Sequence, residues 1–280
     1  MSKCQICGKD AGFFRSAHKE CKQKYEEGSN HIISMATQSA ITQSDLSELQ
    51  QALNKTISVS YIDSESLRYL LITAWEQAVS KVLNDSILSE SEEINLLNFL
   101  RYFKLTIDDV DKNGAYTRVI KSSIIREILD GKIPKRFHVD GLLPFNFQKN
   151  ETLIWLFQNV PYYEPRTRTT YYGSSSGVSL KIAKGVYYRV GGFRGNPVVK
   201  TETVLIDIGI LAITDKHVYF AGNAKSFRIQ YNKIVSFTSY SDGIAIHRDS
   251  ASAKPQVFIT GDGWFTYNLM TNLANLQIQS

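Results

Sequence analysis

The pattern of apolar positions is helical in the first half of the chain. From Ser64, apolar residues recur at spacings of three and four, which places them on one face of a helix. A second run of this kind follows Ser89, and Glu92 three residues later completes a capping-box pair. A third run extends from Ile107 to Leu129. These runs predict a small helical bundle over residues 47–133.

Beyond Pro134 the period of the pattern changes. Short runs rich in Val, Ile, Tyr, Phe and Thr alternate with Gly, Asn, Asp and Ser, as in strands joined by tight turns. Hairpin-like junctions at Ser241-Asp242-Gly243 and Ala221-Gly222-Asn223 predict antiparallel pairing. The candidate strands are 151–158, 178–190, 203–213, 216–221, 225–230, 233–240, 243–247 and 256–260.

The chain closes with Trp264, Leu269, Leu273 and Leu276 at helix-like spacing. Strands followed by one helix favour a small antiparallel barrel or sandwich that the helix plugs. The sequence therefore predicts the α+β class, with a β domain over residues 134–280.

Length and composition agree with a folded, modular protein. A chain of 280 residues, 43% hydrophobic and 21% charged, suits about two domains and a small module. Its longest apolar stretch, 204–214, is interrupted by Asp207 and falls short of the roughly 20 residues that span a bilayer. No apolar signal segment opens the chain, so we expect a cytoplasmic protein without a transmembrane segment. Residues 28–46, rich in Ser, Thr and Gln, are assigned to a linker, with a weak helix as the alternative.

The three cysteines form the sharpest chemical signal. Cys4 and Cys7 are followed by Gly8, and His18 and Cys21 come ten residues later. A Cys-x2-Cys turn lets two thiolates face one ion, and a His and a Cys three residues apart reach the same ion from one helical turn. A Cys3His set favours zinc and leaves no open position, so residues 1–27 are predicted to be a module with a structural zinc ion.

Three alternatives to this zinc site remain open at this stage. The cysteines are ordinary reduced thiols, or Cys4 and Cys7 form a redox pair, although no βαβ pattern surrounds them. His31 is a second candidate for the fourth ligand. The motif resembles the short zinc-finger or treble-clef modules that begin many bacterial multidomain proteins.

An acidic segment lies between two of the predicted helices. Asn84-Asp85-Ser86-Ile87-Leu88-Ser89-Glu90-Ser91-Glu92-Glu93 resembles a signature of the tellurite-resistance TerB-like domains, some of which bind metal through acidic residues. Ser86 stands where that family usually has Gly. The simpler interpretation, carboxylates that cap a helix N-terminus, is favoured. Asp109-x-Asp111-x-Asn113-Gly114 is not a calcium loop, because Ile120 occupies the position that needs a bidentate Glu.

The C-terminal region is similar to PH-like and GRAM-type domains. The segment from Gly209 to Phe220 reads as their first conserved hairpin, and Lys225 to Ile234 and Ser241 to Ile244 as the strands that follow. The resemblance, over roughly 140–278, implies a barrel capped by a C-terminal helix. Domains of this kind bind phosphoinositides, peptides or partner domains, so it leaves the ligand open.

The best candidate contact surface is the segment from Arg166 to Lys200, which carries seven Lys or Arg and no Asp or Glu. Cations suit phosphates, and the interleaved tyrosines suit a membrane interface or stacked bases. A solvated strand face is the alternative, because successive strand residues point to opposite sides. The candidate ligand-binding residues are Arg166, Arg168, Lys181, Lys184, Arg189 and Arg194.

No arrangement of a nucleophile and a base stands out in the sequence. We therefore expect a non-catalytic adaptor whose PH-like domain recognises a membrane surface or a protein partner, with structural Zn²⁺ as its only cofactor. Nucleic-acid binding through the zinc module and the 166–200 segment is the alternative. Oligomeric state does not follow from the sequence.

Overall fold

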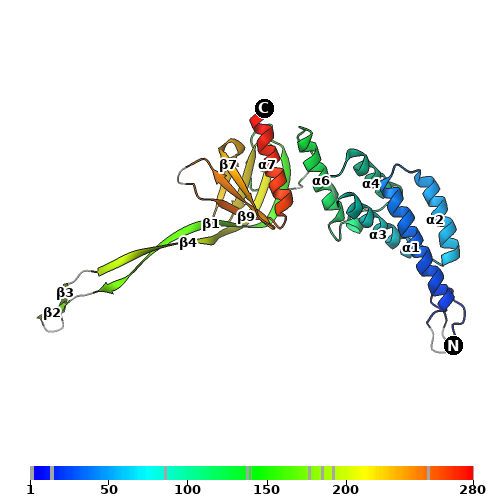
Figure 1. Cartoon of the computed structure of the whole chain (residues 1–280), viewed down its shortest axis with the longest axis horizontal. Coiled ribbons are helices and arrows are strands. Elements are labelled where there is room, and N and C mark those ends of the chain that lie inside the picture. The colour runs from blue at the N-terminus through cyan, green and yellow to red at the C-terminus, as the bar shows by residue number, and fades with distance from the viewer. Residues whose placement is uncertain are drawn as a thin grey trace. The chain divides into compact units, whose positions relative to one another are not determined.

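The structure is a computed structural model in which the chain forms two units, Met1–Arg136 and Phe137–Ser280. The first unit is helical, and the second is an antiparallel sheet with one helix (Figure 1), so the predicted α+β class is confirmed. The residues described are 3–12, 16–84, 87–136, 139, 141–175, 178–183, 186–190, 193–250 and 253–279.

Short polar side chains start the helices of the first unit. Asp45 and Asp63 accept hydrogen bonds from backbone N–H groups two and three residues on. The predicted capping box is confirmed: Ser89 Oγ accepts from Glu92 N at 3.3 Å, and Glu92 Oε2 accepts from Ser89 N at 2.9 Å. The helices are α1 (Lys19–Ile41), α2 (Leu46–Ser60), α3 (Ser64–Val82), α4 (Glu90–Tyr102), α5 (Ile107–Val110) and α6 (Ala115–Leu129).

Two sequence-based expectations need correction in this unit. Residues 28–41, assigned to a linker, belong to α1, whose Ile32, Ala36 and Ala40 are buried in the helical core. The single helix expected from Ile107 to Leu129 is interrupted between α5 and α6. Gly114, the N-cap residue of α6, has φ +70°, a left-handed conformation that a continuous helix does not contain.

The helical core is built around large apolar side chains. Trp75 and Phe99 are fully buried, and Trp75 Nε1 donates to Leu96 O at 3.0 Å, which satisfies the one polar atom of the indole. Helices α1 and α2 approach closely at Gly28. A Cβ atom at that position would lie 2.2 Å from Ser60 Oγ, so a larger residue would push the helices apart.

The second unit contains one seven-stranded sheet in the order β6-β5-β4-β1-β9-β8-β7. Pairing across the two predicted junctions, β5 with β6 and β7 with β8, is antiparallel as expected. The sequence predicted a barrel or a sandwich, and a closed barrel is not formed, because β6 and β7 are the two edges of the sheet. The strands are β1 (Leu153–Ser175), β2 (Val178–Ala183), β3 (Val186–Val190), β4 (Phe193–Thr214), β5 (His217–Gly222), β6 (Ser226–Gln230), β7 (Ile234–Ser239), β8 (Gly243–Arg248) and β9 (Gln256–Ile259).

The terminal helix α7 (Gly263–Gln279) packs against β7, β8 and the short 3-10 helix Tyr231–Lys233. Its buried face consists of Phe265, Leu269 and Leu273, together with Met270. The rings of Phe265 and Trp155 meet edge to face, with centroids 5.1 Å apart. Trp264, expected on the buried face, is 58% exposed because it lies one position away from that stripe.

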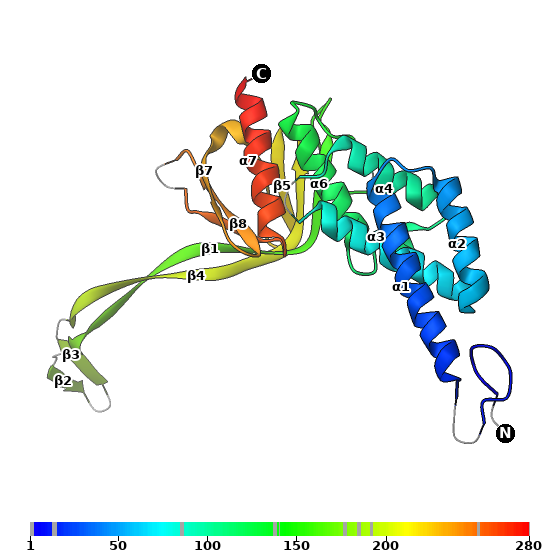
Figure 2. The same ribbon diagram turned by 45° about the vertical axis from the view of Figure 1, so that its right-hand side comes forward.

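A long two-stranded ribbon leaves this sheet (Figure 2). Beyond Glu164 in β1 and before Val204 in β4, the two strands pair only with each other as far as the structure describes them, up to Ser175 opposite Phe193. Strands β2 and β3 form a separate hairpin after it, where the sequence suggested one strand over 178–190. We call residues 164–175 and 193–204 the arm, and β2–β3 its tip.

Candidate metal centre

A tight turn brings the first two cysteines together. Cys4 N donates to Lys9 O at 2.7 Å, and Gly8 N donates to Cys4 O at 2.9 Å. Gly8 has φ +72°, a conformation that a residue with a Cβ atom adopts only with strain. The turn therefore depends on the glycine that follows Cys7, and it holds the Cys4 and Cys7 sulfurs on one side of the loop.

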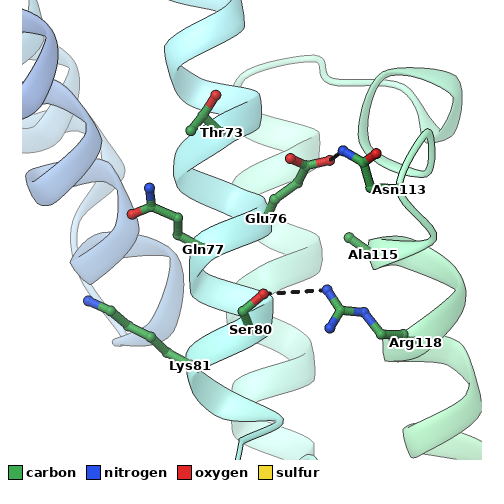
Figure 3. Close-up of a pocket in the computed structure, with 8 residues that line it drawn as sticks. All are labelled: Thr73, Glu76, Gln77, Ser80, Lys81, Asn113, Ala115 and Arg118. Carbon is green, nitrogen blue, oxygen red and sulfur yellow. Dashed lines mark hydrogen bonds between the residues drawn. The ribbon is translucent and has the colours of Figure 1, made fainter.

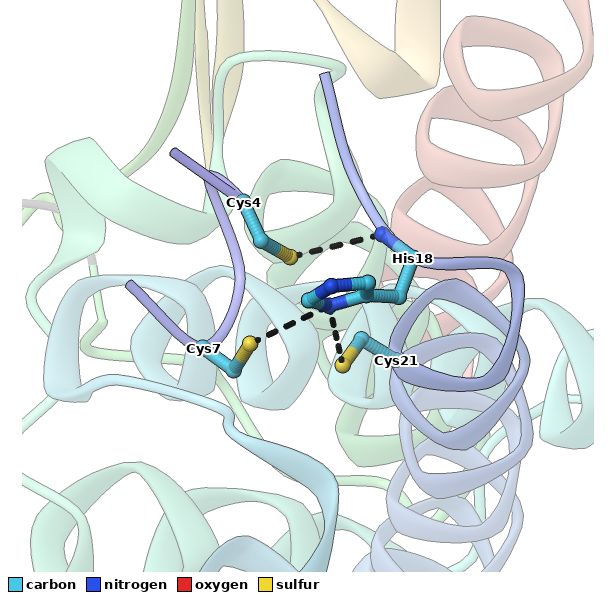
Figure 4. Close-up of side chains that lie close together, drawn as sticks. All are labelled: Cys4, Cys7, His18 and Cys21. Carbon is cyan, nitrogen blue, oxygen red and sulfur yellow. Dashed lines mark hydrogen bonds between the residues drawn. The ribbon is translucent and has the colours of Figure 1, made fainter. Parts of the chain in front are cut away.

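The other two candidate ligands come from the start of α1. His18 is the N-cap residue of this helix, and Cys21 lies in its first turn. Gln5 N donates to Ser16 O at 2.9 Å, which ties the cysteine turn to the segment that enters the helix. Figure 4 shows all four side chains converging on one point.

The distances within this group suit a tetrahedral ion. One ligand atom from each of the four residues lies within 4.8 Å of all the others. His18 Nδ1 lies 3.4 Å from Cys7 Sγ and 3.6 Å from Cys21 Sγ. Zn–S bonds of about 2.3 Å and a Zn–N bond of about 2.0 Å at tetrahedral angles would separate nitrogen and sulfur by about 3.5 Å. The cluster could thus hold a metal ion, and its donor set fits zinc.

The imidazole of His18 is oriented by its second nitrogen. Nε2 lies 2.8 Å from the carbonyl oxygen of Asp10, which can only accept, so Nε2 carries the hydrogen. In the neutral ring, the lone pair is then on Nδ1, the atom that faces Cys7 and Cys21. A hydrogen bond from the outer nitrogen to a carbonyl is the usual way in which proteins orient a metal-binding histidine. Nδ1 is therefore the ligand atom.

The electrostatics of the cluster favour a cation. Burial raises the pKa of the Cys4 thiol, but the backbone amides of Cys7, His18 and Ile6 outweigh burial and lower that pKa to about 6. Burial and the nearby Cys7 sulfur raise the pKa of Cys21 to about 11. The site thus favours the thiolate form of Cys4 and disfavours that of Cys21. A bound cation would stabilise the thiolate form of all three cysteines.

The cluster also takes the place of a core in its module. Cys4 and Cys21 are buried, and Ala11 is the one further residue buried with them among the described residues of this small cluster. His31, the second candidate for the fourth ligand, is exposed on α1 and lies outside the cluster. With four protein ligands, the set has no open position for a substrate, as in structural sites.

The six predicted ligand-binding residues do not form a cluster like that of the four predicted metal ligands. Arg166 is exposed on β1. The backbone places Arg168 on β1, Lys181 on β2, Arg189 on β3 and Arg194 on β4, all in the arm or its tip. Lys184 lies outside the described residues. The structure therefore spreads the five described positions along the arm and its tip.

A cationic hollow at the root of the arm was missed by the sequence analysis. It has a volume of about 420 Å³, and Lys233, Arg248 and Lys254 line it together with Glu164 and Asp249. No ion pair within the described part of the chain uses these three cations. Lys233 ends the 3-10 helix, whereas Arg248 ends β8 and Lys254 lies in the connection between β8 and β9, so the fold of the sheet brings the three cations together.

A buried polar network fastens the start of β1 to the turn between β4 and β5. Glu151 accepts from Thr214 Oγ1 at 2.5 Å and from Tyr219 Oη at 2.8 Å, and its Oε1 lies 2.8 Å from His217 Nδ1. Thr214 is hydrogen-bonded to the carboxylate, not to the imidazole, so the group lacks the nucleophile–base geometry of a hydrolase. We interpret the network as structural.

A hollow in the helical unit offers little chemistry. Figure 3 shows this hollow, of about 470 Å³, between α3 and the start of α6. Its polar side chains bond each other: Asn113 Nδ2 donates to Glu76 Oε1 at 3.1 Å, and Arg118 donates to Ser80 Oγ at 3.4 Å. Neither a histidine nor a cysteine lines it.

The acidic segment before α4 serves structural roles where it is described. Glu92 belongs to the capping box. Glu93 is buried and accepts from Arg126 at 2.6 Å and from Arg136. Asp85 and Ser86 of the TerB-like signature lie outside the described residues. Capping and ion pairing thus account for these two carboxylates without a metal ion.

Within the described ranges, no helix combines the length and the apolar character needed to cross a bilayer. No protein-family model matches this sequence, and no curated protein matches it. Inference about function therefore rests on the Cys3His cluster, the cationic hollow and the arm.

Proposed function

We propose that this chain is a non-catalytic, modular binding protein with a structural zinc site. Its N-terminal module and helical unit act as a scaffold, and its β unit recognises a membrane surface or a protein partner. The observation that carries the proposal is the closed Cys3His cluster, in which four protein atoms surround one point and leave no position for a reacting molecule.

Zinc is supported over other metals by the donor set. Thiolates with one imidazole select a soft or borderline ion and a tetrahedral geometry, whereas Mg²⁺ and Ca²⁺ prefer oxygen ligands. The Asp10 carbonyl that orients His18 adds the outer contact expected of a permanent site.

Recognition by the β unit is supported by two features. The antiparallel sheet with a terminal helix is compatible with the PH-like resemblance of the sequence. The hollow lined by Lys233, Arg248 and Lys254 offers unpaired cations to an anionic headgroup or an acidic side chain.

Zinc content in the purified full chain tests the first half of the proposal. We expect about one zinc per chain, loss of the metal in Cys21→Ser, and no change in His31→Ala, because His31 lies outside the cluster. A wild-type chain without zinc, or a Cys21→Ser variant that keeps it, would refute the site.

Sedimentation with anionic and neutral vesicles tests the second half. A membrane partner predicts binding to anionic vesicles that the double variant Lys233→Glu/Arg248→Glu loses. Lys225→Glu is the matched control, since this exposed lysine lies in the β5–β6 turn, away from the hollow. Zinc without vesicle binding would leave a protein partner as the ligand class.

A further inference from the structure

The register of the arm places its charged positions on one face. In an antiparallel pair, residues that lie opposite each other share a face, and successive residues alternate between faces. Arg166 lies opposite Glu202, Arg168 opposite Lys200, and Ser174 opposite Arg194. Because these positions differ by even numbers along each strand, they share one face. This charged face comprises residues 164, 166, 168, 170, 172 and 174 with 194, 196, 198, 200, 202 and 204.

The opposite face of the arm contains no Lys, Arg, Asp or Glu. Thr167 lies opposite Thr201, and their Oγ1 atoms are 3.1 Å apart, which confirms that an opposed pair shares a face. The residues of this uncharged face are Pro165, Thr167, Thr169, Tyr171, Gly173, Ser175, Phe193, Gly195, Pro197, Val199, Thr201 and Thr203.

The tip repeats this segregation. Ser179 lies opposite Arg189 and Lys181 opposite Tyr187, so both cations share one face of the β2–β3 hairpin. Val178 and Leu180 occupy the alternate face, opposite Val190 and Tyr188. A charge pattern that follows the register in two separate hairpins indicates a surface that meets a partner from one side.

The root of the arm extends the charged surface into the sheet. Glu164, the first position of the charged face, also lines the hollow that contains Lys233, Arg248 and Lys254. The carboxylates near this surface are Glu164, Glu202 and Asp249, all at the root end. Every charged residue in the outer part of the arm is therefore a cation.

From this geometry we propose that the arm binds duplex nucleic acid through its charged face. Successive residues on the same face of one strand are ~6.7 Å apart, about twice the spacing of phosphates along the helix axis in one strand of DNA. The face from Glu164 to Ser174 spans about 33 Å, close to one turn of B-DNA. The major groove, about 12 Å wide, admits a two-stranded ribbon.

A bilayer fits this arrangement less well. Segments that lie in a membrane interface turn their apolar side toward the acyl chains and keep cations at the rim of that same surface. Phe193 of the arm and Val178, Leu180 and Val190 of the tip lie on the face opposite the cations. The cationic face itself contains Tyr172, Val198 and Val204 in the arm and Tyr187 in the tip. A face on which cations recur along both strands and apolar positions are few suits phosphates in a groove.

Fluorescence anisotropy with a labelled DNA duplex of about 24 base pairs, titrated at about 50 to 200 mM salt, tests the proposal. The variant Arg168→Gln/Arg194→Gln/Lys200→Gln is expected to reduce the slope of log K against log salt by about 3 and to weaken binding on the order of 10²-fold at about 0.1 M salt. Thr169→Gln/Tyr171→Gln/Val199→Gln, on the uncharged face of the same strands, is the matched control.

The expected result is a salt-dependent complex that the control variant retains. Arg168→Lys/Arg194→Lys/Lys200→Arg, which keeps each charge, should preserve the slope and so separate loss of charge from damage to the ribbon. Absence of wild-type binding at about 50 mM salt would overturn the proposal, as would equal losses in the control. Binding of the arm to anionic vesicles and not to the duplex would overturn it in favour of a membrane surface.

Discussion

Two parts of the first unit share helix α1 but are stabilised by different means. The module before the helix buries Cys4 and Ala11, with Cys21 from the first helical turn. The bundle beyond it buries a continuous set of apolar side chains around Trp75 and Phe99. A segment of this length cannot bury enough apolar surface to fold unaided, and ligands around one ion take the place of a core.

The two parts should therefore respond to different perturbations. The module should depend on metal and on thiolate protonation, whereas the bundle should depend on packing and on a few buried polar contacts.

Metal removal should have the largest effect and should be confined to the module. Structural zinc contributes about 10 kcal/mol or more of apparent binding free energy, so a chelator should unfold the turn around Gly8 while the bundle stays folded. Amide exchange of residues 3–12, compared with that of α3, measures this difference. Equal protection of residues 3–12 with and without chelator would show that the module needs no metal.

Truncation of the buried tryptophan should destabilise the bundle and leave the zinc module unchanged. Trp75→Ala removes a fully buried side chain and its bond to Leu96 O, and we expect a loss of about 3–5 kcal/mol in the bundle. Chemical denaturation measures this loss, and zinc content should not change. Tyr69→Ala, on the same helix but 69% exposed, is the control that should stay near wild type.

The buried carboxylate of Glu93 should have a smaller and pH-dependent effect. Burial raises the pKa of Glu93, but Arg126 and Arg136 outweigh burial and hold it below its ordinary value of 4.5. A lowered pKa means that the stabilisation is complete above about pH 4.5 and is lost as the pH falls through the folded-state value.

Glu93→Gln should therefore cost about 2 kcal/mol at pH 7, because it removes the carboxylate that Arg126 and Arg136 share in a partly solvated site, while Arg136 keeps its ion pair with Glu127. Denaturation at pH 7 and below pH 4 measures the effect. If Glu93→Gln lost the same free energy of unfolding at the lower pH as at pH 7, the ionised Glu93 carboxylate would not be the source of the stabilisation. Glu90→Gln, an exposed carboxylate of the same helical turn, is the control.

The smallest expected effect is that of the capping box of α4. Ser89→Ala removes the acceptor of the Glu92 N–H and should destabilise the bundle by about 1 kcal/mol. Denaturation of Ser89→Asp, which restores an acceptor, should recover most of the loss. A stability unchanged in Ser89→Ala would mean that water replaces the cap at no cost.

Local features of this chain were predictable because their causes are local. The Cys4-x2-Cys7 turn depends on Gly8, the residue after Cys7, and the start of α4 depends on Ser89 and Glu92, three residues apart. The junctions of β5 with β6 and of β7 with β8 follow from Gly, Asn and Asp at the turns. The orientation of His18, with Nδ1 facing the cysteines, depends on the Asp10 carbonyl, which sequence spacing does not place.

The arm shows where sequence patterns were insufficient. Pro161 and Pro165 interrupt the strand signal in β1, so the strand was expected to end at residue 158. It continues because β4 pairs with it throughout, across a register that no local pattern specifies. Pro165 lies in the arm, where β1 has β4 as its one neighbouring strand, so a missing N–H donor is tolerated there.

The amino-acid sequence by itself determined the cysteine–histidine spacing, the helical and strand periodicities, and the absence of acidic residues from 166 to 200. Only the tertiary structure decided that the sheet stays open, that Lys233, Arg248 and Lys254 meet in one hollow, and that the arm has one charged face. The physical reason is that capping, turns and ligand spacing are set over a few residues, whereas strand register and convergence of distant side chains depend on the packing of the whole unit.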